Sequence, residues 1–73
     1  MTKTIYSKDH KFLIEQLKKA RIEANLDQEK AAELLGKTQS FISKIESGQR
    51  RIDVVQLKEL AKIYKKSITY FLN

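Results

Sequence analysis

The sequence has no cysteine, no proline, one histidine and two glycines. Without cysteine the chain can form neither disulfides nor thiolate metal sites. The lack of proline and the scarcity of glycine are typical of helices joined by short connections. No apolar run approaches the roughly 20 residues that a membrane-spanning helix needs. The first residues, MTKTIYSKDHKF, lack the apolar stretch of a secretory signal, so we expect a cytoplasmic location.

The charge balance is strongly basic. Lysine and arginine number 15 against 9 aspartates and glutamates, which gives a net charge of +6 and a pI of about 9.7. These values are in the range of nucleic-acid-binding domains, although charge alone is weak evidence for a partner. The distribution of charge says more, because residues 37–51 hold four cations and one anion. These are Lys37, Lys44, Arg50, Arg51 and Glu46.

Seventy-three residues are enough for one domain with a small core. The spacing of apolar residues predicts a compact all-α domain of five helices over residues 7–73, preceded by a loose arm at residues 1–6. Because no disulfide is possible, so small a core has to be stable through packing alone or through packing plus a partner subunit. The core residues expected from the first, fourth and fifth helices are Leu13, Leu17, Ala20, Ala24, Leu57, Leu60, Ala61, Tyr64, Ile68, Phe71 and Leu72.

Short polar residues indicate where these three helices begin. The first helix should begin at Ser7 or Asp9 and end near Ala24. Asp53 is expected to cap the fourth helix and Ser67 the short fifth helix, because such side chains accept hydrogen bonds from first-turn N–H groups.

The stretch DQEKAAELLGKTQSFISKIES, from Asp27 to Ser47, predicts two short helices joined by a tight turn. Asp27 is a good N-cap for the first of them. Gly36 is free to take the left-handed conformation that ends a helix, and Thr38 can cap the next one through its hydroxyl. The helix-turn-helix unit expected here covers about residues 28–47.

The second helix of this unit, residues 39–47, has two distinct sides. Ile42 and Ile45 share the apolar side. The polar side consists of Gln39, Ser40, Ser43 and Lys44. Amides and hydroxyls with one cation suit base edges and phosphates. For an isolated helix, a solvated polar face is the more frequent explanation, so the surrounding sequence has to decide.

That surrounding sequence resembles the lambda-repressor-like helix-turn-helix family, also called XRE or Cro-type. The resemblance extends from Leu17 to Leu72 and rests on an ordered set of positions. These are Leu26, Asp27, Gln28, Glu29, Ala32, Leu35, Gly36 and the run TQSFISKIESG from Thr38 to Gly48. The resemblance implies a five-helix DNA-binding domain and a transcriptional regulator, expected to be a repressor, that binds double-stranded DNA.

The resemblance and the helix sides together indicate the DNA contacts. Helix 39–47 would enter the major groove, and Gln39 would be the leading base reader because its amide can both donate to and accept from adenine. The other base readers expected are Ser40, Ser43 and Lys44. The DNA backbone contacts expected are Gln28, Lys37, Thr38, Gln49, Arg50 and Arg51, of which Gln28 is implied by the resemblance. Phe41 would touch a thymine methyl or the sugar backbone, or cover the seam between the two helices.

Two structural expectations also come from the resemblance. Arg21 would form an ion pair with Glu46 and tie the first helix to the DNA-reading helix. A homodimer would bind a roughly palindromic operator, with two reading helices about 34 Å apart. Its contacts are expected at Tyr70, Phe71 and Leu72, although closing the core of one subunit is an equally good explanation for Phe71.

The alternative function is a helical protein-interaction module, such as an antitoxin or antirepressor component whose main ligand is another protein. An enzyme is not expected, because His10 is isolated and the sequence has no glycine-rich phosphate loop and no paired carboxylates that converge on a pocket. We expect no cofactor and no metal, and regard His10 as a solvated residue near a helix start. RNA binding lacks the aromatic stacking platform that such modules use.

Overall fold

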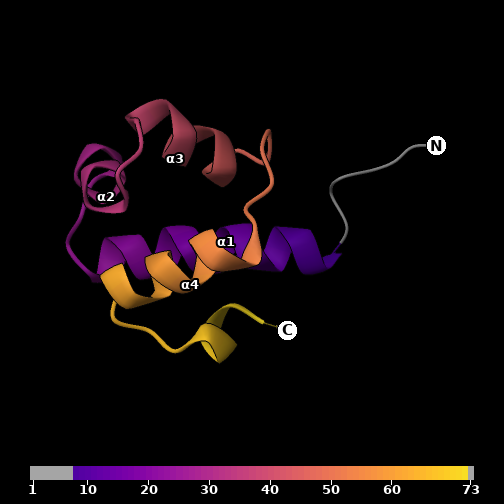
Figure 1. The fold of residues 1–73 in the computed structure, drawn as a ribbon. Coiled ribbons are helices and arrows are strands. Elements are labelled where there is room, and N and C mark those ends of the chain that lie inside the picture. The colour runs from indigo at the N-terminus through magenta and orange to yellow at the C-terminus, as the bar shows by residue number, and fades with distance from the viewer. Residues whose placement is uncertain (1–7, 73) are drawn as a thin grey trace.

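The computed structural model describes residues 8–72, so the arm predicted at residues 1–6 lies outside the described residues. Within this described range, four α-helices are followed by one 3₁₀ helix (Figure 1). Their bounds are α1 Lys8–Glu23, α2 Gln28–Leu35, α3 Gln39–Glu46, α4 Val54–Ile63 and η1 Ile68–Phe71. The all-α class is confirmed. The fifth element is a 3₁₀ helix rather than an α-helix, a geometry that is common for runs of three or four residues.

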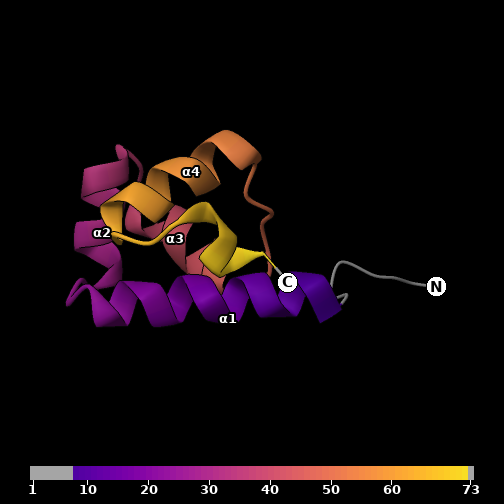
Figure 2. The same ribbon diagram turned by 90° about the horizontal axis from the view of Figure 1, so that it is seen from below.

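The longest helix, α1, lies along one side of the molecule, and the other elements stack on its inner side (Figure 2). α2 packs against α3 and α4, and α3 also contacts α1. η1 closes the core by packing against α1 and α4. Every helix therefore contributes to a single core between α1 and the rest.

The core contains most of the residues predicted for it. Its buried apolar side chains are Leu17, Ala20, Ala31, Ala32, Ile42, Ile45, Leu57, Leu60, Ala61, Tyr64 and Phe71. Leu13, Ala24 and Ile68 are only partly buried at its edge. Leu72 is 55 % exposed, so its assignment to the core is wrong. The backbone leaves the last turn at Leu72 in an extended conformation, and the side chain does not follow Phe71 inward.

Of the starts predicted for α1, Ser7 lies outside the described residues and Asp9 lies inside the helix. Three of the four caps predicted for the later elements form. Asp27, Thr38 and Asp53 each accept a hydrogen bond from the backbone N–H three residues later, at 2.7, 3.3 and 2.7 Å. The cap predicted at Ser67 is wrong, because its side chain makes no capping bond to η1. The Ser67 hydroxyl lies 2.7 Å from the Thr69 hydroxyl instead, and the two share a hydrogen bond.

Among residues 8–72, four have the left-handed backbone conformation that ends a helix. Gly36, with φ of 78°, ends α2 as predicted, and Gly48, with φ of 84°, follows the end of α3. Asn25 and Lys65, with φ of 61° and 60°, do the same after α1 and α4. The sequence carried no glycine to signal these two positions. At Lys65 the conformation is costly, because a Cβ approaches the following carbonyl oxygen.

Candidate nucleic-acid interface

α3 turns its polar side away from the protein. The exposed residues of this side are Gln39, Ser40, Ser43 and Lys44. On the opposite side Ile42 and Ile45 are each 2 % exposed and hold the helix against the core. The helix therefore presents amide, hydroxyl and ammonium groups on one accessible surface, which are the groups that contact base edges and phosphates.

A tight turn fixes the angle between α2 and α3. Gly36 leaves α2 in the left-handed conformation, and the Lys37 N–H donates to the Ala32 carbonyl at 2.8 Å. Thr38 then caps α3. Apart from Gly36 itself and its two chain neighbours, no residue has a heavy atom within 4 Å of the place where a Cβ would stand at Gly36. The backbone angle, rather than crowding, is what favours glycine here.

An ion pair joins α3 to α1. Arg21 Nε donates to Glu46 Oε2 at 2.7 Å, and Arg21 Nη2 donates to Glu46 Oε1 at 3.1 Å. Arg21 Nη1 also donates to the Leu26 carbonyl at 2.8 Å. The side chains of Arg21 and Glu46 are only 11 % and 5 % exposed. Hydrogen bonding to Glu46 raises the pKa of Arg21, and the pair stands where the family resemblance implied.

Gln28 extends this pair toward the polar side of α3. Gln28 Nε2 donates to Glu46 Oε1 at 3.0 Å, and Gln39 Nε2 donates weakly to Gln28 Oε1 at 3.4 Å. One amide hydrogen of Gln28 is therefore used inside the protein. The phosphate contact expected at Gln28 stays a prediction for the second hydrogen of the same amide group. Gln39, the expected base reader, is oriented by a chain of side chains that starts at Arg21.

The expected backbone-binding residues lie on both flanks of α3. Thr38 and Lys37 precede the helix, while Gln49, Arg50 and Arg51 follow it, and all five are exposed. Within residues 8–72, none of the four cations of this region forms an ion pair, whereas its one anion, Glu46, is neutralised by Arg21. The surface around α3 is therefore positively charged and suited to a polyanion.

Residues 17–71 match the helix-turn-helix family HTH_3. The chain belongs to this family. A solved structure of hydroxypropylphosphonic acid epoxidase from S. wedmorenis is similar to 85 % of the HTH_3 chain, with 27 % sequence identity and a TM-score of 0.77. The chain spans 33 % of that protein. None of the curated proteins matches the chain. The likeness supports the fold and transfers no epoxidase activity to this HTH_3 domain.

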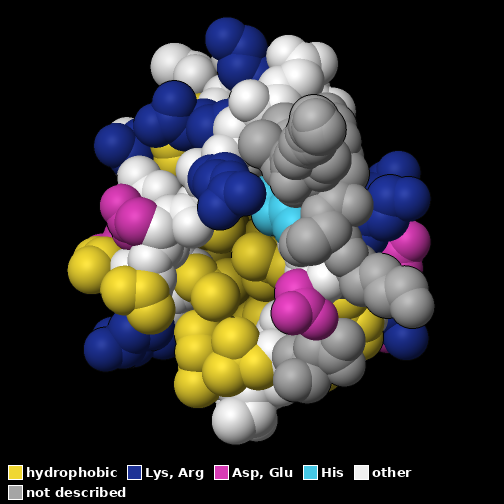
Figure 3. All heavy atoms as spheres, turned by 90° about the vertical axis from the view of Figure 1, so that its right-hand side faces the viewer, with side chains coloured by type: hydrophobic (Ala, Val, Ile, Leu, Met, Phe, Trp, Pro, Cys, Tyr) yellow, Lys and Arg dark blue, Asp and Glu magenta, His cyan; other side chains and the backbone are white. Residues whose placement is uncertain are grey.

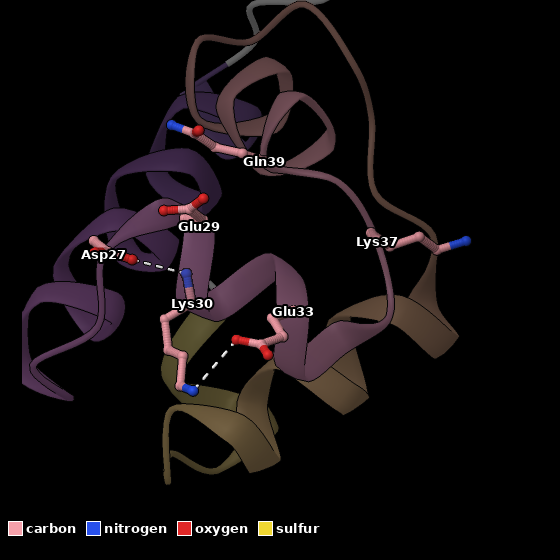
Figure 4. Close-up of a pocket in the computed structure, with 6 residues that line it drawn as sticks. All are labelled: Asp27, Glu29, Lys30, Glu33, Lys37 and Gln39. Carbon is pink, nitrogen blue, oxygen red and sulfur yellow. Dashed lines mark hydrogen bonds and ion pairs between the residues drawn. The ribbon is translucent and has the colours of Figure 1, made fainter.

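A shallow hollow lies beside the helix-turn-helix unit (Figure 4). Its lining residues are Asp27, Glu29, Lys30, Glu33, Lys37 and Gln39. Lys30 Nζ forms an ion pair with Glu33 Oε1 at 3.3 Å, so the charge of one of the two lysines that line the hollow is neutralised. Three carboxylates make this hollow a less suitable site for phosphate than the surface of α3 and its flanks.

Among residues 8–72, no group of three or more His, Cys, Asp and Glu side chains is arranged to hold a metal ion. No helix in that range is long and apolar enough to cross a bilayer.

The three residues expected at a dimer contact differ in accessibility. Phe71 is 1 % exposed and meets the Tyr70 ring edge-on at 5.2 Å between centroids. Phe71 therefore closes the core, which was the alternative considered for it, and has no surface to offer a second subunit. Tyr70 is partly buried under the Lys66 ammonium, 4.7 Å from its ring centroid, whereas Leu72 is exposed.

Several contacts had no counterpart in the sequence analysis. Lys66 Nζ binds Glu23 Oε1 at 2.8 Å across a separation of 43 residues, and Gln16 Nε2 donates to the Tyr70 carbonyl at 3.1 Å across 54. The Phe41 ring lies close to the side-chain cations of Lys37 and Arg50. Periodicity identifies which side of a helix is buried, but it does not identify the partner of a long polar side chain on another element.

Proposed function

We propose that this protein is a sequence-specific, double-stranded DNA-binding transcriptional regulator that reads the major groove with α3. The observation that carries the proposal is the outward polar side of α3, anchored from behind by Ile42 and Ile45. A helix presented in this way fits the width of the major groove. The membership of residues 17–71 in the HTH_3 family supports the same function.

In this proposal each group on α3 has a chemical role. Gln39 reads adenine through its amide, and the hydroxyls of Ser40 and Ser43 donate to or accept from neighbouring base edges. Lys44 donates to guanine acceptors or to a phosphate. The backbone contacts proposed are Gln28, Lys37, Thr38, Gln49, Arg50 and Arg51. If about four to six phosphates are neutralised per subunit, affinity falls steeply as salt increases.

Regulation would follow from occupancy of an operator. We propose a homodimer that places two α3 helices about 34 Å apart on a roughly palindromic site, and repression by exclusion of other proteins from that site. Leu72 and the accessible part of Tyr70 are the remaining candidates for the dimer contact. Phe71 is removed from that set by its burial.

The experiment is selection of bound fragments from random duplex DNA, followed by titration of the selected duplex. We expect a symmetric site, and at least a tenfold loss of affinity for the triple variant Gln39→Ala, Ser43→Ala, Lys44→Ala, since each good base contact is worth about 1–3 kcal/mol. Lys58→Ala, on the exposed side of α4, is the matched control for loss of one charge. Full affinity of the triple variant would contradict the proposal.

A second candidate function is a protein-interaction module such as an antitoxin or antirepressor component. Apolar side chains gather on the face of the molecule where α1 and α4 begin, with basic side chains above them (Figure 3). Val54, Val55 and Leu72 are 66 %, 62 % and 55 % exposed. Exposed apolar side chains of this kind are typical of partner contacts. This candidate predicts normal partner binding by the triple α3 variant and loss of partner binding in Val55→Asp.

A further inference from the structure

Phe41 is the single aromatic residue of α3, and two cations lie near its ring. The Arg50 guanidinium carbon is 4.6 Å from the ring centroid, and the Lys37 ammonium nitrogen is 5.5 Å from it. Lys37 stands in the turn before α3, and Arg50 stands in the loop after it. One ring in the first turn of α3 thus contacts a residue from the segment before the helix and a residue from the segment after it.

These contacts are energetically meaningful. A cation within about 6 Å of an aromatic centroid is attracted by the negative charge on the face of the ring. In the range 8–72 neither Lys37 nor Arg50 forms an ion pair, so no carboxylate competes with the ring for them. The ring itself is held, because Phe41 is half-buried and packs against the core.

The contact with the ring leaves the hydrogen-bond donors of both cations available. Attraction to an aromatic face depends on the positive charge and uses none of the five N–H donors of arginine or the three of lysine. Arginine in particular can rest on a ring and still present its N–H groups to a phosphate. Both side chains therefore keep their donors available to DNA while they rest against the ring.

We propose that Phe41 is a positioning residue for DNA backbone binding. Its ring holds Lys37 and Arg50 together beside the first turn of α3, so that the DNA backbone next to this turn meets two cations that are already in place. The gain is the conformational entropy of two long side chains that does not have to be lost on binding. The inference rests on the proposed DNA-binding function and adds a role for a residue that need not touch DNA.

Two other roles for Phe41 make different predictions. A contact between the ring and a thymine methyl would make affinity depend on Phe41 even when both cations are absent, and only at sites that contain that thymine. A purely structural role would lower the melting temperature and leave the salt dependence of binding unchanged. The experiment therefore has to separate base contact, stability and cation positioning.

The test is a mutant cycle on the selected duplex. Phe41→Leu and Phe41→Met keep an apolar side chain and remove the aromatic face, while Phe41→Tyr keeps the face. Each is made in the natural sequence and in the Lys37→Ala, Arg50→Ala background. Affinity is titrated over a series of salt concentrations, and a thermal melt of each variant reports its folding. Lys62→Ala, an exposed cation on α4, is the matched control for charge.

We expect Phe41→Leu and Phe41→Met to weaken binding about three- to tenfold at ~0.1 M salt. The salt dependence should also flatten, because cations that the ring does not hold contact phosphate less often. Phe41→Tyr and Lys62→Ala should bind like the natural protein. In the Lys37→Ala, Arg50→Ala background, replacement of Phe41 should cause no further loss. Ring-current shifts of the Arg50 side-chain protons, lost in both apolar variants, give a second readout that does not involve DNA.

If Phe41→Leu and Phe41→Met bound the duplex as tightly as the natural protein, the positioning role of Phe41 would be overturned, while the proposed DNA-binding function would still stand. An equal loss of affinity in the background without the two cations would also overturn the positioning role, because the ring would then act by itself. Should one apolar variant fail to melt cooperatively, the other variant and the ring-current shifts decide. Failure of the natural protein to bind any duplex would overturn the proposed function and this inference together.

Discussion

The Arg21 guanidinium donates two hydrogen bonds to the Glu46 carboxylate, at 2.7 Å from Nε and 3.1 Å from Nη2. The two residues are 25 positions apart and stand on α1 and α3. Their pairing fixes the helix that carries the candidate base readers to the longest helix of the fold. The same carboxylate accepts a hydrogen bond from Gln28, which in turn accepts one from Gln39.

We expect this ion pair to be strongly coupled. Arg21→Met and Glu46→Leu should each lower the free energy of unfolding by about 3–5 kcal/mol, because each leaves a nearly buried charge without its partner. The double variant should lose much less than the sum, since no charge is stranded in it. Urea unfolding of the four proteins measures the coupling.

The exposed pair between Lys30 and Glu33 is the control for this cycle. Its side chains are 56 % and 69 % exposed, so Lys30→Ala should change the free energy of unfolding by about 0.5 kcal/mol or less. Small and additive losses at Arg21 and Glu46 would show instead that their ion pair is as well solvated as this one.

The helix caps should differ in their contribution to stability. The Asp53 side chain accepts a hydrogen bond from the Gln56 N–H at 2.7 Å, and the Gln56 side chain accepts one from the Asp53 N–H at 3.3 Å. The two bonds together form a capping box. Asp53→Ala should therefore cost about 1–2 kcal/mol of unfolding free energy. Ser67→Ala should change it by less than about 0.5 kcal/mol, because Ser67 makes no capping bond. If Asp53→Ala and Ser67→Ala lowered the melting temperature equally, the finding that Ser67 makes no capping bond to η1 would be contradicted.

Lys65 offers a stabilising substitution. Its left-handed backbone, with φ of 60°, strains a residue that carries a Cβ, and glycine adopts this conformation without that cost. We expect Lys65→Gly to raise the free energy of unfolding by about 0.5–1 kcal/mol. Lys58→Gly in the interior of α4 is the matched change and should lower it by about 1 kcal/mol. A loss of stability in both variants would argue against the left-handed turn.

Tyr64 should make stability depend on pH in the alkaline range. Burial raises the pKa of Tyr64 from 10.0 to about 12, with a further contribution from the Glu46 charge. Between these values the folded protein keeps a proton that the unfolded chain has lost. The contribution of Tyr64 is therefore complete below about pH 10 and is lost as the pH rises through about 12.

The measurement is chemical unfolding from about pH 9 to about pH 12 for the natural protein and Tyr64→Phe. The natural protein should lose roughly 1–2 kcal/mol more than Tyr64→Phe over this range, because phenylalanine has no proton to release. Parallel pH profiles for the two proteins would mean that the Tyr64 hydroxyl titrates as it does in water.

The helices themselves were largely determined by local sequence. Asp27, Thr38 and Asp53 precede apolar patterns of helical period, and Gly36 and Gly48 follow two of them, so these caps and ends were predictable from neighbouring residues. Ile42 and Ile45 recur at a helical interval, and that interval was enough to predict which side of α3 faces the core. Burial of one side then left the polar side exposed.

Tertiary structure decided what these local signals do not specify. The ends of α1 and α4 at Asn25 and Lys65 depend on where the chain has to turn, and Leu72 is exposed because the chain leaves the last turn there. Phe41 meets Lys37 and Arg50, and Gln28 meets Glu46, only after the turn at Gly36 and the loop after Gly48 set the position of α3. Helix formation depends on residues three or four apart in the chain. The partners of long polar and aromatic side chains depend instead on distances between elements that exist only once the core has packed.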